Sequence, residues 1–298
     1  MTAAFHIALP ATSANLGPAF DTAALAWDSW LRLTATAARS WSVEAMGREA
    51  ELCARLDDHL IVNVYTGILA RHGLPAVPLE LRLDNEIPVG KGCGSSAAAR
   101  LAGVALASHF GGLGWPAQRI FEEAVRSEGH PDNVAACWWG GLVVAQGRGE
   151  GNPVRWLRVP AGGQWELLLA VPPQALATSE SRRVLPAQYS RADVAVNLQN
   201  TALLLQAWQQ GREELLAHAM HDRLHQPYRA ALCPLLPALA PLVGQNGILG
   251  CALSGAGPAV VLIVRSSADA IPAVAAAVEL ASLEAELLAG KLVVAGPG

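Results

Sequence analysis

Charged side chains are scarce in this sequence of 298 residues. They make up 15% of the chain, against roughly 25% in average soluble domains. The 21 basic and 25 acidic residues leave a net charge of −4, while apolar residues make up 52%. These values argue against a disordered chain and against a broad electrostatic surface for nucleic acid or an anionic membrane. An anionic ligand therefore needs a local site, built from backbone N–H groups and a few arginines.

Cysteine pairs and long apolar runs are also missing. The five cysteines are scattered and never stand in CxxC spacing, which argues against a disulfide framework or a zinc cage. Residues 230–264 contain no charge, but four prolines interrupt them, so we interpret them as buried core and a loop instead of a membrane span. The first residues lack a basic segment followed by an apolar one. We therefore expect no signal peptide, a cytoplasmic protein, and no membrane or nucleic-acid partner.

The order of the expected elements favours an α+β fold. The patterns predict strands over 5–9, 30–36, 79–83, 140–145, 165–171, 248–253 and 260–264, and helices over 60–72, 95–110, 117–127, 194–209, 213–224, 235–243 and 268–288. Strict βαβ alternation is absent, so a doubly wound parallel sheet is disfavoured. The Gly-rich residues 147–153 suggest a turn or linker. We expect an N-terminal domain over 1–155 and a C-terminal domain over 156–298.

The most specific local pattern is PVGKGCGSSAAA, residues 88–99. Alternate glycines allow the backbone to approach a ligand closely, and Ser95 and Ser96 are expected to cap a helix whose first N–H groups lack partners. Such a loop suits a phosphate, and Lys91 adds a cation. Taken alone, the pattern fits a structural turn equally well. The P-loop, the complete dinucleotide fingerprint and the hydrolase nucleophile elbow are absent.

Three other segments contain small and polar residues that suit a binding site. PATSANLGPAFD, residues 10–21, offers Asn15 and Asp21, which can bind an ammonium group or form an Asx turn. EGHPDN, residues 128–133, can supply a carboxylate ligand for Mg²⁺. It can also be a solvated acidic turn, or contribute a His–Asp pair to a hydrolase-like triad. SGAGPA, residues 254–259, permits close backbone approach or forms a plain hairpin.

Two arginines stand in surroundings that contain little charge. Arg182 lies in TSESRR, and Arg229 ends DRLHQPYR, residues 222–229. A guanidinium group can bind a carboxylate through two hydrogen bonds. Most such arginines have structural or surface roles, so both interpretations stay open on the residues alone.

The four segments occur in a fixed order, and together they resemble the GHMP small-molecule kinase family, with the likeness strongest to its homoserine-phosphorylating members. The resemblance extends over nearly the whole chain, and DRLHQPYR supports it. It implies an N-terminal domain like ribosomal protein S5 domain 2 and a ferredoxin-like C-terminal domain. It also implies ATP and L-homoserine as substrates, Mg²⁺ as cofactor, a place in threonine biosynthesis, and a homodimer. A different hydroxylated substrate such as L-threonine, or an inactive binding module, are the alternatives.

The resemblance also implies which residues bind the nucleotide and the metal. Ser96 and Glu128 would hold Mg²⁺, with Glu122 as the rival acid. Asn63 would lie in the adenosine pocket. The residues implied around the phosphates are Pro88, Val89, Gly90, Lys91, Gly92, Cys93, Gly94, Ser95, Ser96, Ala97 and Ala98, joined by Ser254 and Gly255. A thiol beside a helix N-terminus can have a lowered pKa, but we predict that Cys93 is a packing residue.

For the amino acid, the resemblance implies that Asp21 takes the ammonium with Asn15 beside it. Arg182 and Arg229 would take the carboxylate, Thr178 would line the site, and Asn133 would face the reacting hydroxyl. The implied catalytic set is Ser96, Glu128, Asn133 and Arg182. Asp132 is the best available base and His130 a weaker one, for which we expect a turn-stabilising role. A loose phosphoryl-transfer transition state requires alignment and charge neutralisation more than early proton removal.

Overall fold

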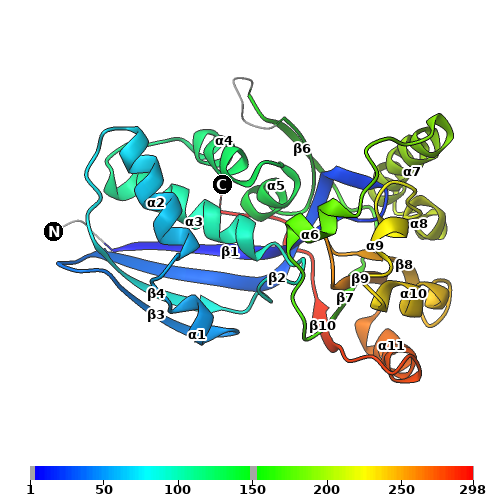
Figure 1. The fold of residues 1–298 in the computed structure, drawn as a ribbon. Coiled ribbons are helices and arrows are strands. Elements are labelled where there is room, and N and C mark those ends of the chain that lie inside the picture. The colour runs from blue at the N-terminus through cyan, green and yellow to red at the C-terminus, as the bar shows by residue number, and fades with distance from the viewer. Residues whose placement is uncertain (1–3, 148–152, 298) are drawn as a thin grey trace.

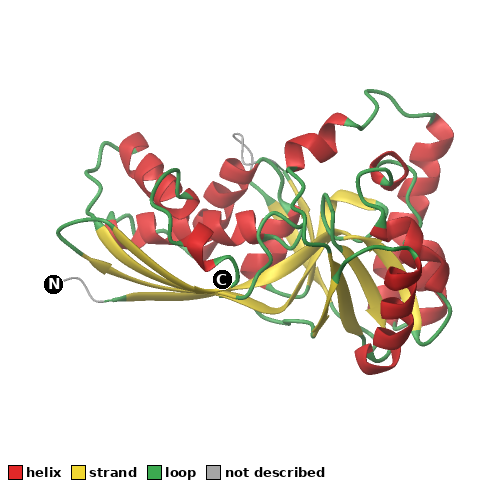
Figure 2. Cartoon of the chain, turned by 60° about the horizontal axis from the view of Figure 1, so that its bottom comes forward, coloured by secondary structure: helices red, strands yellow, loops and turns green. Residues whose placement is uncertain are grey.

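The computed structural model describes residues 4–147 and 153–297, which form two β-sheets (Figures 1 and 2). The first sheet has the order β3-β4-β2-β5-β6, and β1 also pairs with β2. The second is an antiparallel sheet in the order β10-β7-β9-β8. The strands of the first sheet are β1 (Phe5–Asn15), β2 (Ala19–Ala37), β3 (Ser42–Gly47), β4 (Leu79–Asn85), β5 (Leu142–Gln146) and β6 (Arg155–Val159). Those of the second are β7 (Glu166–Val171), β8 (Ile248–Leu253), β9 (Val260–Val264) and β10 (Glu286–Gly290).

The long hairpin of β1 and β2 joins the two halves of the molecule. We expected the first strand to stop at Pro10, and this was wrong. Pro10 pairs with Trp30 at a register shift, because an irregularity in a ladder tolerates a residue without an N–H. The strand continues to Asn15, so the PATSANLGPAFD segment over 10–21, which we interpreted as a loop after the first strand, is mostly paired strand with a short turn. In Figure 1 this dark blue turn lies among the green and yellow helices of the second half.

Helices cover one face of the first sheet (Figure 2). They are α2 (Leu60–Arg71), α3 (Ser95–Phe110), α4 (Ala117–Glu128) and α5 (Asp132–Trp139), whereas the short α1 (Ala50–Cys53) follows β3. Small residues allow α3 to be buried against both α2 and the sheet. A Cβ on Gly103, for example, would stand 2.7 Å from the Cβ of Val64. Close packing of the alanine-rich helix therefore fixes where its N-terminus lies.

The second half contains two long helices, α7 and α11, and several short ones around its sheet. They are α6 (Thr178–Arg183), α7 (Arg191–Gln210), α8 (Glu213–Ala219), α9 (Gln226–Arg229), α10 (Leu235–Leu239), the 3₁₀ turn η1 (Ala240–Leu242) and α11 (Ser267–Leu280). The helix predicted over 213–224 ends earlier, because the Asp222 carboxylate accepts the N–H groups of residues 224, 225 and 226. A side chain that satisfies backbone donors in this way competes with a continuing helix.

The helix predicted over 268–288 is also wrong in its last part. It ends at Leu280, and Glu286–Gly290 form β10, which pairs with β7. The leucine-rich sequence has good helix propensity, but pairing with a neighbouring strand overrides a local preference. Strands β3 and β6 and helices α1, α5, α6 and α9 were not predicted at all. The buried apolar residues of α5 show why: a short apolar run fits a helix or a strand equally well.

The α+β class is confirmed by the two sheets and their flanking helices. Residues 148–152 of the predicted linker lie outside the described residues. The domain division near 155 stays a prediction; the chain leaves the first sheet after β6 and enters the second at β7. The C-terminal residues return to the first sheet, where Leu292 bridges Trp27. Among the described residues, no helix has both the length and the apolar character that crossing a membrane requires.

Candidate active site

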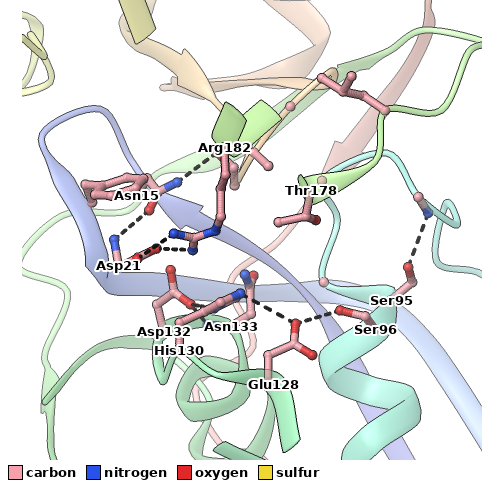
Figure 3. Close-up of a pocket in the computed structure, with 18 of the residues that line it drawn as sticks. Asn15, Asp21, Ser95, Ser96, Glu128, His130, Asp132, Asn133, Thr178 and Arg182 are labelled. Carbon is pink, nitrogen blue, oxygen red and sulfur yellow. Dashed lines mark hydrogen bonds and ion pairs between the residues drawn. The ribbon is translucent and has the colours of Figure 1, made fainter. Parts of the chain in front are cut away.

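A pocket between the two halves brings most of the predicted site residues together (Figure 3). Its walls come from the β1–β2 turn, the loop before α3, the α4–α5 connection, α6, α9 and the loop after β8. The predicted residues that line it are Asn15, Asp21, Gly90, Gly92, Gly94, Ser95, Ser96, Glu128, Asn133, Thr178, Arg182, Arg229 and Gly255. Segments that are far apart in the sequence thus form one site.

The loop before α3 has the backbone shape of an anion cradle. Gly90, Gly92 and Gly94 have positive φ angles of 71°, 82° and 75°, whereas Lys91 and Cys93 between them do not have positive φ angles. Alternation of left- and right-handed residues turns successive N–H groups toward one side, which suits an anion. The expected serine caps were wrong: Gly94 is the N-cap, and Ser95 and Ser96 are the first two residues of α3. The free N–H groups at this helix end add to the positive potential.

Close contacts fix this loop from behind. A Cβ on Gly92 would lie 2.2 Å from the carbonyl oxygen of Ser254. The Ser254 hydroxyl lies 2.7 Å from the carbonyl oxygen of Gly92 and donates to it, and the N–H of Gly255 donates to Ala14. The SGAGPA loop therefore braces both the anion loop and the end of β1, and Ser254 acts from behind the pocket wall.

Ser96 and Glu128 form the oxygen-rich part of the pocket. The Ser96 hydroxyl donates to Oε1 of Glu128 at 2.6 Å, while Arg100, one turn further along α3, pairs with Oε2. The Glu128 side chain is 7% exposed. A hydroxyl and a carboxylate beside an anion loop are the hard oxygen ligands that Mg²⁺ prefers, so these residues fit the metal. The rival Glu122 accepts from Gln118 at 2.9 Å and does not line the pocket.

The α4–α5 connection presents His130, Asp132 and Asn133. Nδ1 of His130 lies 2.7 Å from Oδ1 of Asp132, which also accepts the N–H of Asn133. The side-chain oxygen of Asn133 accepts from Thr12 at 2.7 Å. Burial opposes the charged form of His130, but the hydrogen bond to Asp132 and the surrounding carboxylates outweigh it and raise the pKa of His130. The bond to Asp132 fits the turn-stabilising role that we expected.

Asp21 and Arg182 face each other across the pocket as an ion pair with two contacts. Nη1 and Nη2 of Arg182 lie 3.0 and 2.7 Å from the two carboxylate oxygens of Asp21. The Asn15 side chain accepts the N–H of Asp21 and donates to the carbonyl of Gly255. Both Asn15 and Asp21 have positive φ angles, 70° and 50°, a strained conformation that is typical of functional sites.

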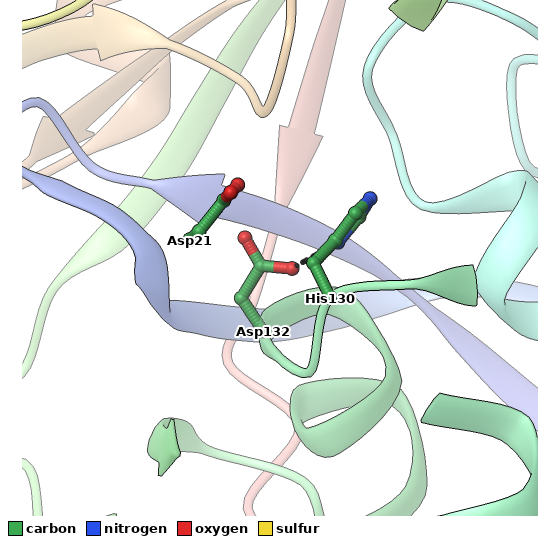
Figure 4. A group of neighbouring side chains, drawn as sticks. All are labelled: Asp21, His130 and Asp132. Atoms are coloured by element: carbon green, nitrogen blue, oxygen red, sulfur yellow. Dashed lines mark hydrogen bonds and ion pairs between the residues drawn. The ribbon is translucent and has the colours of Figure 1, made fainter. Parts of the chain in front are cut away.

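Asp21, His130 and Asp132 form a compact cluster (Figure 4). One potential ligand atom from each lies within 4.8 Å of the others. Each of the three already has a charged partner, since Asp21 pairs with Arg182 and Asp132 with His130. The cluster is thus explained by its ion pairs without a metal.

Arg229 is the deepest charged group in the pocket wall, with only 1% of its surface exposed. Its Nε donates to the carbonyl of Ser181, and its Nη1 contacts Nδ1 of His225 at 3.0 Å. Burial, joined by the charge of Arg182, lowers its pKa, although a guanidinium remains charged in proteins. Arg182 and Arg229 both lie over the ring of Phe20, at 5.5 and 5.4 Å. Two guanidinium groups thus converge on one side of the pocket.

Several predicted residues lie outside the walls of this pocket. Asn63 is exposed on α2 and donates to Asp58, and Lys91 lies 3.6 Å from Glu49. Cys93 is fully buried, and burial raises its thiol pKa to about 12, so no lowered pKa accompanies the helix N-terminus. The other residues behind the wall are Pro88, Val89, Ala97, Ala98 and Ser254.

Sequence reasoning missed some residues of the site. Thr12 is buried and positions Asn133, Phe20 lies under the two arginines, and Arg100 pairs with Glu128. Thr12 and Phe20 stand inside the PATSANLGPAFD segment, so their place in the motif was a usable signal. Arg100 follows Ser96 by four residues, which puts both on one side of a helix. The remaining lining residues are Leu176, Ala256 and Gly257.

Comparisons with known proteins agree with this architecture. The family profile for the GHMP kinases N terminal domain matches residues 59–141, and that for GHMP kinases C terminal matches residues 202–276. A homoserine kinase of Solibacter usitatus is 42% identical over 90% of this chain and 87% of its own length. A homoserine kinase of Deinococcus radiodurans is 37% identical over 86% and 83%.

Solved structures share the fold. The homoserine kinase of Cytophaga hutchinsonii aligns with a TM-score of 0.83 at 22% identity, covering 99% of this chain and 97% of that one. L. major mevalonate kinase, solved with R-mevalonate, aligns with a TM-score of 0.71 at 13% identity, covering 97% and 96%. The resemblance predicted from the motifs and the two-domain architecture are confirmed: the chain belongs to the GHMP kinase family.

Proposed function

We propose that this protein is a homoserine kinase, which transfers the γ-phosphoryl group of ATP to the side-chain hydroxyl of L-homoserine in threonine biosynthesis. The products are O-phospho-L-homoserine and ADP. One observation carries the proposal: a single pocket joins a backbone anion cradle at one end to a carboxylate and two guanidinium groups at the other. The homoserine kinases among its relatives support the choice of substrate.

At the cradle end, residues 88–98 bind the phosphates through backbone N–H groups and the N-terminus of α3. Ser96 and Glu128 hold Mg²⁺, which when bound neutralises charge on the phosphates. Arg100 keeps the Glu128 carboxylate oriented toward Ser96. Ser254 and Gly255 keep the loop in place, and Asn63 contributes to the adenosine pocket.

At the other end, the Asp21–Arg182 pair accepts a zwitterion by exchange. The ammonium of the amino acid replaces Arg182 on Asp21, and its carboxylate pairs with Arg182 and Arg229. Every charge that the exchange separates then gains a new partner. An acceptor without an ammonium group cannot draw Arg182 away from Asp21 without leaving that carboxylate unpaired, at a cost of about 1–3 kcal/mol. The pocket therefore favours an amino acid over a mevalonate-type alcohol.

Asn133 faces the reacting hydroxyl, held by Thr12, and Thr178 lines the path between the two ends. Asp132 is the best available acceptor for the hydroxyl proton, but it is already bonded to His130. Phosphoryl transfer through a loose transition state depends mainly on alignment and charge neutralisation. The residues of this pocket supply both without a strong base. We also propose that the enzyme acts in the cytoplasm as a homodimer.

An assay of ADP release tests the proposal. The purified protein is incubated with ATP and L-homoserine, L-threonine, L-serine or mevalonate, each with and without Mg²⁺. We expect the largest acceleration with L-homoserine and Mg²⁺, and the smallest with mevalonate. A rate that L-homoserine does not raise above the ATP-only background would reject the proposed function. A faster rate with L-threonine would keep the phosphotransfer and replace the acceptor.

A further inference from the structure

His225 lies between the two sides of the amino-acid end of the pocket. It is fully buried and precedes α9 in the DRLHQPYR segment. Its Nε2 is 2.7 Å from the carbonyl oxygen of Gly17, and its Nδ1 is 3.0 Å from Nη1 of Arg229. One imidazole ring thus contacts the β1–β2 turn and a substrate-binding arginine.

These two contacts define the tautomer. Arg229 can only donate, so Nδ1 of His225 must carry a lone pair. The carbonyl of Gly17 can only accept, so Nε2 must carry the proton. The ring is therefore neutral with its proton on Nε2. Burial lowers the pKa of His225, and the opposing charge of Asp222 does not reverse this effect.

The position of the ring is itself fixed. Oδ2 of Asp222 accepts the backbone N–H of His225 at 2.9 Å and that of Gln226 at 2.6 Å. The ring stacks on Phe20, with centroids 5.1 Å apart and planes at 28°. Backbone and ring are therefore both held before any ligand binds.

The turn that His225 contacts carries the ammonium side of the site. Asn15 and Asp21 flank this turn. A Cβ on Gly17 would stand 2.0 Å from the carbonyl oxygen of Met220. The carbonyl of Pro18 accepts from Asn197 at 2.6 Å. The turn is thus packed tightly against the second half of the molecule. The hydrogen bond from His225 to the carbonyl of Gly17 therefore anchors the imidazole ring to a rigid segment.

Arg229 carries the carboxylate side. Nε donates to Ser181 and Nη1 to His225, and no hydrogen bond of Nη2 occurs within the described part of the chain. Ser181 is held by its own hydroxyl bond to Ala256 at 2.7 Å. The hydrogen bonds to Ser181 and His225 therefore fix the orientation of the Arg229 guanidinium group and leave its Nη2 atom available for a ligand.

We propose that neutral His225 is a positioning residue of the amino-acid site, which directs the carboxylate-binding Arg229 through its Nδ1 atom. This inference rests on the proposed function. It assigns His225 to substrate recognition, not to proton transfer or nucleotide binding. Its Nε2 contact to the carbonyl of Gly17, on a turn that is already rigid, fixes the tautomer in which Nδ1 is the acceptor for Arg229.

Two substitutions separate the two contacts. In His225→Asn the side-chain oxygen replaces Nδ1 as acceptor for Arg229, and the donor to Gly17 is lost. In His225→Gln the amide nitrogen replaces Nε2 as donor to Gly17, and the acceptor for Arg229 is lost. His221→Gln is the matched control, because the same change is made four residues away at an exposed position outside the pocket. Steady-state constants for L-homoserine and ATP are measured for all four proteins, with the unfolding temperature as a check of folding.

We expect His225→Gln to raise the homoserine KM by about 10-fold or more, with kcat and the ATP KM changed less than about threefold. His225→Asn should retain a homoserine KM within about threefold of wild type even though it loses the bond to Gly17. If either substitution lowers the unfolding temperature, the ratio of the homoserine KM to the ATP KM in the folded enzyme still shows which substrate is affected. As a second readout, the rise in unfolding temperature caused by L-homoserine should shrink in His225→Gln, and that caused by ATP should not.

An unchanged homoserine KM in His225→Gln would overturn the inference. So would equal effects of the Asn and Gln substitutions, or a parallel rise of both KM values, since each indicates a general structural role. A wild-type protein without homoserine-dependent turnover would reject the proposed function itself and the inference with it. The wild-type measurement thus distinguishes the two failures.

Discussion

The two ends of the pocket bind charge in different ways. The cradle end uses backbone N–H groups and glycines from one continuous segment, residues 90–96, with little side-chain charge. The amino-acid end uses charged side chains from distant segments: Asp21 and Arg182 are separated by 161 positions. At the cradle end the binding groups belong to the main chain. At the amino-acid end they are side chains, and Asp21 and Arg182 neutralise each other until a ligand replaces one of the two partners.

This difference predicts how each end tolerates change. Backbone donors cannot be removed by substitution, so the cradle is damaged mainly through its shape. Charged side chains can be removed singly, and each loss leaves a partner unpaired. Substitutions at the cradle should therefore impair folding and nucleotide binding, whereas those at the amino-acid end should act on one substrate.

The largest effect is expected from Gly94→Ala. The residue has a φ of 75°, and its Cβ would lie 1.9 Å from the Thr12 hydroxyl and 3.1 Å from the Thr12 nitrogen. Strain and overpacking together should cost about 2–5 kcal/mol of unfolding free energy. Gly112→Ala is the control, because its φ is 64° and nothing lies within 4 Å. Chemical denaturation that gives both variants the same loss would show that the cradle is not tightly packed.

Arg229→Ala and Arg182→Ala should each raise the homoserine KM by about 10- to 100-fold, which corresponds to the loss of a charged hydrogen bond. The ATP KM should change by less than about threefold. Arg183→Ala, an exposed neighbour outside the pocket, is the matched control. Initial-rate measurements with each substrate varied in turn provide the comparison. Equal rises of both KM values would refute the carboxylate role of the two arginines.

Ser96→Ala tests the Ser96–Glu128 oxygen pair at the cradle end. Loss of the hydroxyl that contacts Glu128 should lower kcat by about 10-fold at low Mg²⁺, with partial recovery at high Mg²⁺. Ser95→Ala removes the adjacent hydroxyl, whose one hydrogen bond among the described residues is accepted from the N–H of Gly90 at 3.4 Å, and should change kcat far less. Measuring the reaction rate as a function of Mg²⁺ concentration tests whether Ser96 belongs to the metal site. Wild-type kcat at low Mg²⁺ would remove Ser96 from the metal site.

The smallest effect concerns an ion pair away from both ends. Arg48 forms two contacts with Glu286 on β10, and this hydrogen bonding lowers the pKa of Glu286. Stability gained from a lowered carboxylate pKa is present above the unfolded-state value and is lost as pH falls through the folded-state value. Glu286→Gln should therefore lower the free energy of unfolding by about 0.2–1 kcal/mol at pH 7 and by less at about pH 2. Urea denaturation at both pH values measures this difference, and a constant difference would contradict the assignment.

The same contrast explains what the sequence could predict. The cradle is one motif, and its glycine spacing indicated both the loop and the start of α3. The α+β class and the helices α2, α3 and α4 followed from periodic patterns that tertiary contacts then reinforce. The serine caps were wrong because a left-handed glycine takes the N-cap position, a choice that the letters alone do not decide.

The amino-acid end depended on residues that only the fold brings together. Asp21, Arg182 and Arg229 were named through family resemblance, since nothing in their local sequence shows that they meet. Thr12, Phe20 and His225 lie inside the PATSANLGPAFD and DRLHQPYR motifs, which marks them as candidates, but no local pattern predicts the distant partners through which they act. Strand β10 was missed for the same reason, because its pairing with β7 overrides the helix propensity of its leucines.

A crystal structure of the protein with L-homoserine and a non-hydrolysable ATP analogue tests the central claim most directly. We expect the triphosphate on the N–H groups of residues 88–98, the ammonium of the amino acid on Asp21, and its carboxylate between Arg182 and Arg229. A triphosphate bound anywhere other than residues 88–98 would contradict the account.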